Sequence, residues 1–176
     1  MSAQVIETER LSLHLFCAAS ASDVAFTHQL LNEPSFVHGI GDRGVRTLED
    51  AHAYLMMGPV ASYEANGFGM YRLQEQSSGA SIGMVGLVKR ATLQHVDLGY
   101  ALLPAFWGKG YALEAARAVR DHAHGLIGLP RIVAITQPGN AGSIRVLEKL
   151  DFRFQAVVQW APENVELKLF AHEARS

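Results

Sequence analysis

The sequence has little cysteine and no excess of charge of one sign. Cys17 is its single cysteine, so an internal disulfide is excluded and a reducing, cytoplasmic location is the simplest expectation. The 15 Lys and Arg residues are nearly balanced by 17 Asp and Glu residues, and no basic stripe is present. Because nucleic acid binding depends mainly on clustered positive charge, we expect no nucleic acid partner.

Long apolar runs and metal-ligand spacings are missing as well. No segment approaches the roughly 18 to 20 apolar residues of a membrane span, so we expect no membrane association. The polar first residues also lack the layout of a signal peptide. The histidines show no ligand spacing, and His122 and His124 do not face each other on a helix. The sequence therefore predicts no metal site.

What remains is the composition of an ordinary globular protein, with 49% apolar and 18% charged residues. A chain of 176 residues is long enough to bury one continuous core, and no linker or internal repeat divides it. We therefore expect a single domain over residues 1–176.

Alternating and helical patterns of apolar residues predict a mixed α/β fold. Strands are expected at residues 10–16, 69–74, 81–89, 96–103, 131–136, 154–160 and 165–171. Helices are expected at residues 24–32, 47–64, 112–125 and 140–150. Ser22, Asp23 and Thr47 are candidate helix caps, while Pro34 and Gly67 are expected to stop the first two helices. The predicted order is β-α-α-β-β-β-α-β-α-β-β, a mixed sheet flanked by helices.

The most informative stretch is a glycine turn at residues 107–112, between a predicted strand and a predicted helix. Gly108 and Gly110 let the backbone approach a ligand closely, because no Cβ atom is in the way. The first amides of the helix that follows have no partner within it and lie at the positive end of its dipole. This geometry suits a phosphate or pyrophosphate, although a tight turn without a ligand has the same sequence pattern.

Two common nucleotide-binding motifs fit this turn poorly. A dinucleotide-binding fingerprint requires a third glycine where this chain has Leu113. A P-loop requires Ser or Thr directly after its lysine, but Gly110 follows Lys109. The anion must therefore be identified from other segments.

Four segments, in the right order, resemble those of the GNAT superfamily of acetyl-CoA-dependent N-acyltransferases. The resemblance is to its RimJ/RimL-type branch of ribosomal-protein N-terminal acetyltransferases, and it covers nearly the whole chain. The segments are IETERLSL (residues 6–13), DLGYALLP (97–104), WGKGYA with the following Leu-Glu-Ala (107–115) and NAGSIRVLEKLDF (140–152). Two positions depart from the usual pattern, since Trp107 replaces Gln or Arg and Asp151 replaces Gly.

The resemblance implies the GNAT fold, in which the fourth strand (residues 96–103 here) bulges and splays from the fifth. It also implies acetyl-CoA as co-substrate. Backbone amides of residues 108–112 would bind its pyrophosphate, and unpaired groups around Leu102 would pair with the pantetheine arm or polarise the thioester carbonyl. Asn140 would bind the same arm, cap the next helix, or do both. The complete expected set is Leu102, Trp107, Gly108, Lys109, Gly110, Tyr111, Ala112 and Asn140.

The implied reaction is direct transfer of an acetyl group to an amine in a ternary complex. Ser143 stands where this branch has a hydroxyl group; it is the candidate acid, or a helix serine that bonds its own backbone. Asp97 is a candidate base, or the partner in an ion pair. Glu163, near a glutamate position of the branch, is a second candidate base, or a solvated turn residue.

The acceptor amine stays open at this point. The resemblance favours the N-terminal amine of a protein, and the alternative is a small amine such as an antibiotic, polyamine or amino acid. A third interpretation is a non-catalytic domain that binds acyl-CoA as a sensor. Phe36, His38, Tyr63 and Glu64 are expected to line the acceptor pocket, because the first helices shape it in relatives. The protein would be a monomer or a homodimer, since the last strands of such folds can pair across subunits.

Overall fold

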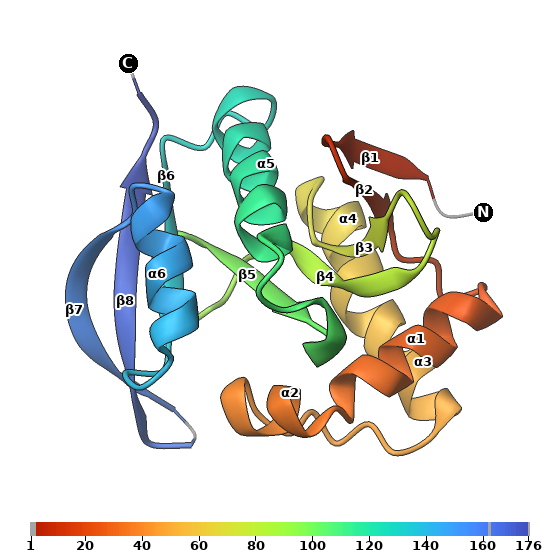
Figure 1. Ribbon diagram of the computed structural model, residues 1–176. Coiled ribbons are helices and arrows are strands. Elements are labelled where there is room, and N and C mark those ends of the chain that lie inside the picture. Colours follow the sequence, from red (N-terminus) through yellow and green to blue (C-terminus); the bar gives the residue numbers. More distant parts are fainter. Residues whose placement is uncertain (1–2, 162, 176) are drawn as a thin grey trace.

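The computed structural model describes residues 3–161 and 163–175. Its central element is one sheet of eight strands in the order β1-β2-β3-β4-β5-β6-β8-β7 (Figure 1). All neighbouring strands are antiparallel except β5 and β6. The strands are β1 (Gln4–Glu7), β2 (Leu11–Leu15), β3 (Met70–Glu75), β4 (Ser81–Val88), β5 (Val96–Leu102), β6 (Arg131–Thr136), β7 (Arg153–Trp160) and β8 (Val165–Glu173). The helices are α1 (Ala21–Leu31), α2 (Pro34–Gly39), α3 (Leu48–Leu55), α4 (Ala61–Asn66), α5 (Tyr111–Gly125) and α6 (Ala141–Lys149).

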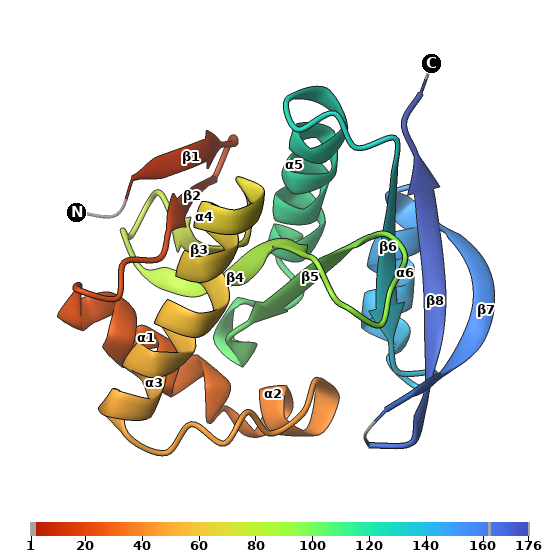
Figure 2. The ribbon, with the colours of Figure 1, turned by 180° about the vertical axis from the view of Figure 1, so that it is seen from behind.

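Helices cover both faces of this sheet, which confirms the predicted α/β class. α5 and α6 lie in front in Figure 1, and α3 and α4 lie in front when the molecule is seen from behind in Figure 2. α5 packs Ala115, Ala116 and Val119 into the main core. A second core cluster joins α1, α2 and α3 to Met84 of β4 and to Leu103. Among the described residues, no helix is both long and apolar enough to cross a bilayer.

The helical run from α3 to α4 follows from local chemistry. Thr47 caps α3 and forms a capping box with Asp50, as predicted. The run widens into a π-helical turn (Met56–Val60) because Pro59 has no backbone N–H to donate. Gly67 ends the run in the left-handed conformation, with φ at 75°. The predicted helix is therefore confirmed, with an interruption that periodicity did not indicate.

Several predictions near the N-terminus were wrong. Ser20, rather than Ser22, caps α1. Asp23 is no cap, because its buried carboxylate pairs with Arg72 of β3 at 3.1 Å. Pro34 begins α2 as well as ending the preceding segment, since its fixed φ suits the first position of a helix. β1 and α2 were both missed because four to six residues are too few to show a period.

β5 and β6 separate soon after they begin. Their parallel pairing joins only Val96 to Ile132 and Asp97 to Val133, whereas β5 pairs with β4 as far as Leu102. The predicted splay is thus confirmed. The bulge expected in β5 was wrong, because its register with β4 is regular throughout. The opening between β5 and β6 arises from their lost pairing alone.

Candidate functional site

The glycine turn before α5 has the backbone geometry of an anion site. Gly108 and Gly110 both have positive φ, at 74° and 80°. The first hydrogen bond of α5 joins the Glu114 amide to Gly110 O at 3.0 Å. No acceptor for the amides of residues 108–113 is found in the part of the chain that the structure describes. These amides are therefore available to a ligand at the positive end of α5.

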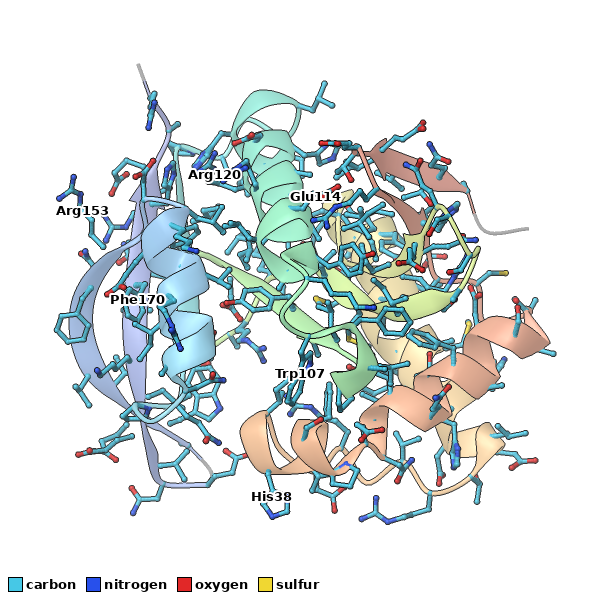
Figure 3. All side chains as sticks on the ribbon, viewed as in Figure 1. His38, Trp107, Glu114, Arg120, Arg153 and Phe170 are labelled. Atoms are coloured by element: carbon cyan, nitrogen blue, oxygen red, sulfur yellow. The ribbon has the colours of Figure 1, made fainter. Side chains whose placement is uncertain are left out.

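A hydrogen-bond network ties this turn to the N-terminal strands. The Glu114 carboxylate accepts hydrogen bonds from Thr8 Oγ1 at 2.6 Å and from the Arg10 amide and Nε at 2.9 and 2.7 Å. Arg10 Nη1 also donates to Lys109 O at 2.8 Å. Burial alone would raise the pKa of Glu114, but these bonds lower it below its ordinary value. Figure 3 shows Glu114 between α5 and the strands β1 and β2.

The side chain of Tyr111 contributes to the same support. Its hydroxyl donates to the Glu75 carboxylate, and the Arg10 guanidinium lies over its ring at 4.5 Å. Tyr111 is 8% exposed as a whole residue and belongs to the main core. The ammonium group of Lys109 lies over the Phe106 ring at 5.2 Å.

Backbone groups of β5 face the opening between β5 and β6. The Leu103 amide donates to Ile82 O at 2.8 Å, and the antiparallel ladder alternates from that bond. Tyr100 and Leu102 therefore direct their amides and carbonyls away from β4. Trp107 Nε1 donates to Leu102 O at 2.9 Å, so one of the two lone pairs of this carbonyl oxygen is already used. The Leu102 amide and the second lone pair of its carbonyl stay available for the expected pairing with the pantetheine arm.

Asn140 and Ser143 lie together in the first turn of α6. Asn140 caps the helix, and its Oδ1 accepts a hydrogen bond from the Ser143 amide at 3.0 Å. The Asn140 Nδ2 amino group has no acceptor among the described residues, so it can donate to a ligand. The capping role and the predicted binding role are therefore compatible.

The Ser143 hydroxyl contacts a residue that the sequence analysis did not single out. Tyr100 Oη of β5 lies 2.8 Å from Ser143 Oγ and 3.2 Å from Ser143 O. This contact connects β5 to α6 across the opening. Burial raises the pKa of Tyr100 to about 12, and the bond with Ser143 opposes the rise.

Asp97 is a buried carboxylate at the closed end of the opening, where β5 and β6 stop pairing. It is 2% exposed, and its Oδ2 accepts from Arg90 Nε at 2.8 Å. Arg90 also lies over the Trp160 ring at 5.5 Å. Burial raises the pKa of Asp97 to about 6, while Arg90 and the Ile135 amide lower it. Within the described chain, Asp97 Oδ1 accepts no hydrogen bond.

The remaining predicted site residues do not gather here. Glu163 is exposed in the turn between β7 and β8, at the sheet end where β6 also ends. Phe36 is buried in the second core cluster, and Tyr63 uses its hydroxyl to accept from the Phe16 amide at 3.1 Å. Both residues therefore take part in packing or backbone hydrogen bonds of the fold. His38 O accepts from Gln137 Nε2 at 3.0 Å, which ties α2 to the segment after β6.

Two histidines contact each other away from this site. His124 Nε2 lies 2.9 Å from His172 Nδ1, and His124 Nδ1 lies 2.6 Å from Leu129 O. Across the described residues, no group of three or more His, Cys, Asp or Glu side chains could bind a metal ion.

The partners of several candidate site residues were not predicted from the sequence. A carboxylate such as Asp97 in an apolar strand requires a positive partner, so Arg90, across the turn from it, could have been found. Arg10 and Glu114 pair over a separation of 104 positions, for which no local pattern exists. Tyr100 carried a weak signal, because its neighbours at alternate positions, Leu98 and Leu102, are core residues.

Most of the chain matches the sequence model of one protein family. Residues 10–153 match the model described as the acetyltransferase (GNAT) domain. The chain belongs to the GNAT acetyltransferase family. YjcK of Bacillus subtilis (strain 168), a probable N-acetyltransferase, is 42% identical over 88 residues, which cover 49% of this chain and 47% of YjcK. This GNAT chain spans about half the length of the first curated relatives it matches.

Solved structures share the fold of this GNAT domain. The acetyltransferase from Agrobacterium tumefaciens str. C58 has a TM-score of 0.79 at 24% identity, covering 98% of this chain and 96% of that one. RimL, the ribosomal L7/L12 alpha-N-protein acetyltransferase in complex with coenzyme A, has a TM-score of 0.80 at 18% identity, covering 97% and 98%. The resemblance to the GNAT superfamily and the predicted fold are both confirmed.

Proposed function

We propose that this GNAT domain is an N-acetyltransferase that transfers the acetyl group of acetyl-CoA directly to a bound amine. The observation that carries the proposal is that groups suited to bind acetyl-CoA lie around one opening, the one between β5 and β6. The unpaired amides of residues 108–113 follow the end of β5. The backbone groups of Tyr100 and Leu102 on β5 face the opening, and Ser143 lies across it on α6. The shared fold with RimL, which was solved in complex with CoA, supports acetyl-CoA as the donor.

The glycine turn fits a pyrophosphate. Several amides without an acceptor in the described chain follow a backbone that only glycine adopts easily, and Lys109 adds positive charge, while the charge of Arg10 is balanced by Glu114. The Leu102 amide and the Asn140 amino group would bind the pantetheine arm. An amide on β5 would also polarise the thioester carbonyl as negative charge develops on its oxygen.

Two side chains are placed to handle charge and protons. Asp97, with a pKa of about 6, is ionised at neutral pH, so it can accept the proton of the acceptor amine directly or through a water molecule. Ser143 can donate a hydrogen bond to the sulfur as the C–S bond breaks. A thiol with a pKa near 8.5 is a tolerable leaving group, so most of the acceleration would come from positioning and carbonyl polarisation. Glu163 stays the second candidate base.

We propose the N-terminal amine of a protein as acceptor, in a cytoplasmic setting. This choice rests on the four sequence segments that resemble the ribosomal-protein branch. The alternatives are a small-molecule amine and a sensor domain without turnover.

The test is thiol release from acetyl-CoA with a panel of acceptors. We expect turnover with peptides that begin with Ala or Ser, and no turnover with the same peptides carrying an acetylated N-terminus, which controls for lysine acetylation. Mass spectrometry would locate the added acetyl group. Turnover with small amines alone would contradict a protein acceptor. Calorimetric binding of CoA without turnover on any acceptor would contradict the enzyme and support the sensor.

A further inference from the structure

The hydroxyl groups of Tyr100 and Ser143 form a hydrogen-bonded pair in which one of them is the preferred donor. Their oxygens are 2.8 Å apart, and either hydroxyl could donate on geometry alone; the second acceptor within reach of Tyr100 Oη, the Ser143 carbonyl oxygen, is farther away at 3.2 Å. A phenol is a stronger acid than an aliphatic alcohol, and the stronger acid is the better donor in a mixed pair. When Tyr100 donates to Ser143 Oγ, the proton of Ser143 is left free to point into the opening between β5 and β6.

The two residues are also held firmly. Tyr100 and Ile144 both pack against the main core, so β5 and the first turn of α6 share one rigid support. Asn140 fixes the Ser143 amide at 3.0 Å, which sets the position of the serine Cα. A donor held this way needs little reorganisation when charge appears nearby.

We propose that Tyr100 is a positioning residue for the leaving group: its hydroxyl donates to Ser143 Oγ and thereby directs the Ser143 proton at the departing sulfur. This inference rests on the proposed function.

The chemical step balances without ionising either hydroxyl. The C–N bond forms, the C–S bond breaks, and its electron pair leaves with the sulfur, while the amine proton passes to Asp97 or water. A thiolate whose conjugate acid has a pKa near 8.5 is too weak a base to deprotonate a phenol whose pKa is about 12. The thiolate is therefore stabilised by a hydrogen bond from the Ser143 hydroxyl, and the hydrogen bond that Ser143 accepts from Tyr100 strengthens it. Solvent protonates the thiolate after release.

The decisive variant is Tyr100→Phe, which keeps the ring and removes the hydroxyl. We expect kcat to fall about tenfold, because one hydrogen bond supporting a charged group is lost, while KM for acetyl-CoA stays within about twofold. Tyr71→Phe is the matched control, since Tyr71 is a buried core tyrosine outside this site and its variant should keep the parent kcat. Thermal unfolding of both variants measures any general loss of stability.

A double-mutant cycle separates positioning from a merely structural role. If Tyr100 acts through Ser143, Tyr100→Phe combined with Ser143→Ala should be no slower than Ser143→Ala alone. Multiplicative losses in the double variant, or an unchanged kcat in Tyr100→Phe, would overturn the inference while the parent enzyme still turns over. Absence of turnover in the parent with every acceptor would overturn the proposed function and this inference with it.

Discussion

The glycine turn can be tested by adding a single methyl group at Gly108. Gly108 has φ at 74°, and a Cβ atom there would meet no heavy atom within 4 Å. Gly128 has φ at 78° and is equally open, so Gly128→Ala imposes the same backbone strain without touching the turn. The two glycines flank the 15-residue helix α5, and an α-helix of that length spans about 22 Å.

The two variants should lose similar stability but differ in their binding of acetyl-CoA. An L-residue in the left-handed region costs about 1–2 kcal/mol, which for a chain of this size lowers Tm by about 2–8 °C in both variants. Only Gly108→Ala also places a methyl group where the pyrophosphate would approach the amides. Loss of one hydrogen bond to a charged group costs about 1.5–3 kcal/mol, so KM for acetyl-CoA should rise about ten- to hundredfold.

The assay is thiol release at varied acetyl-CoA concentration, with CoA binding measured by calorimetry. We expect Gly128→Ala to keep the parent KM and CoA affinity despite its lower Tm. Equal KM values for Gly108→Ala and Gly128→Ala would refute the assignment of residues 108–113 as the pyrophosphate site.

Three further predictions address the surroundings of the site. Glu114→Gln weakens the network that supports the turn, so KM for acetyl-CoA should rise about threefold or more with little change in kcat; a change in kcat alone would contradict this role. With Asp97 as base, log(kcat/KM) should fall with slope 2 as the pH is lowered below about 6, because the carboxylate and the amine each bind one proton. In Asp97→Asn the slope should be 1, and equal slopes in the two proteins would remove Asp97 from the mechanism. Gly86→Ala should destabilise the domain by about 2 kcal/mol or more in urea unfolding, because its Cβ would lie 2.2 Å from Gly69 O. Gly99 lies directly opposite on β5, and a Cβ there would meet Met70 Sδ at 3.9 Å and Met70 Cε at 4.0 Å, so Gly99→Ala should be tolerated; equal losses would contradict the steric argument.

Elements with a strong internal period could be predicted from the sequence, and elements set by distant contacts could not. α5 and β6 were predicted nearly to the residue, because α5 shows a helical apolar period and β6 is a short apolar run with a polar residue at each end. The glycine turn was found because two glycines at alternate positions carry a backbone requirement of their own. The regular register of β5 was not predicted, because a bulge was expected there from the family resemblance and not from the residues of the strand itself.

The chemistry of the candidate site divides in the same way. Ser143 and Asn140 were placed correctly in the first turn of α6, because capping is a local property of the sequence. Whether Ser143 bonds its own backbone or another residue depended on Tyr100, a side chain 43 positions away. The partner of Trp107, the Leu102 carbonyl, required knowing how the chain turns after β5.

The tie between Arg10 and the glycine turn has a consequence for the order of folding. The turn and α5 are close in sequence and can form early, but Arg10 reaches Lys109 over 99 positions, and closing such a loop is slow. Before β2 docks, the turn lacks the side chain that fixes its carbonyl, and its amides are free to sample other directions. Ability to bind CoA should therefore appear late in refolding, after helical structure has returned. The time at which CoA binding returns would then report when the N-terminal strands dock.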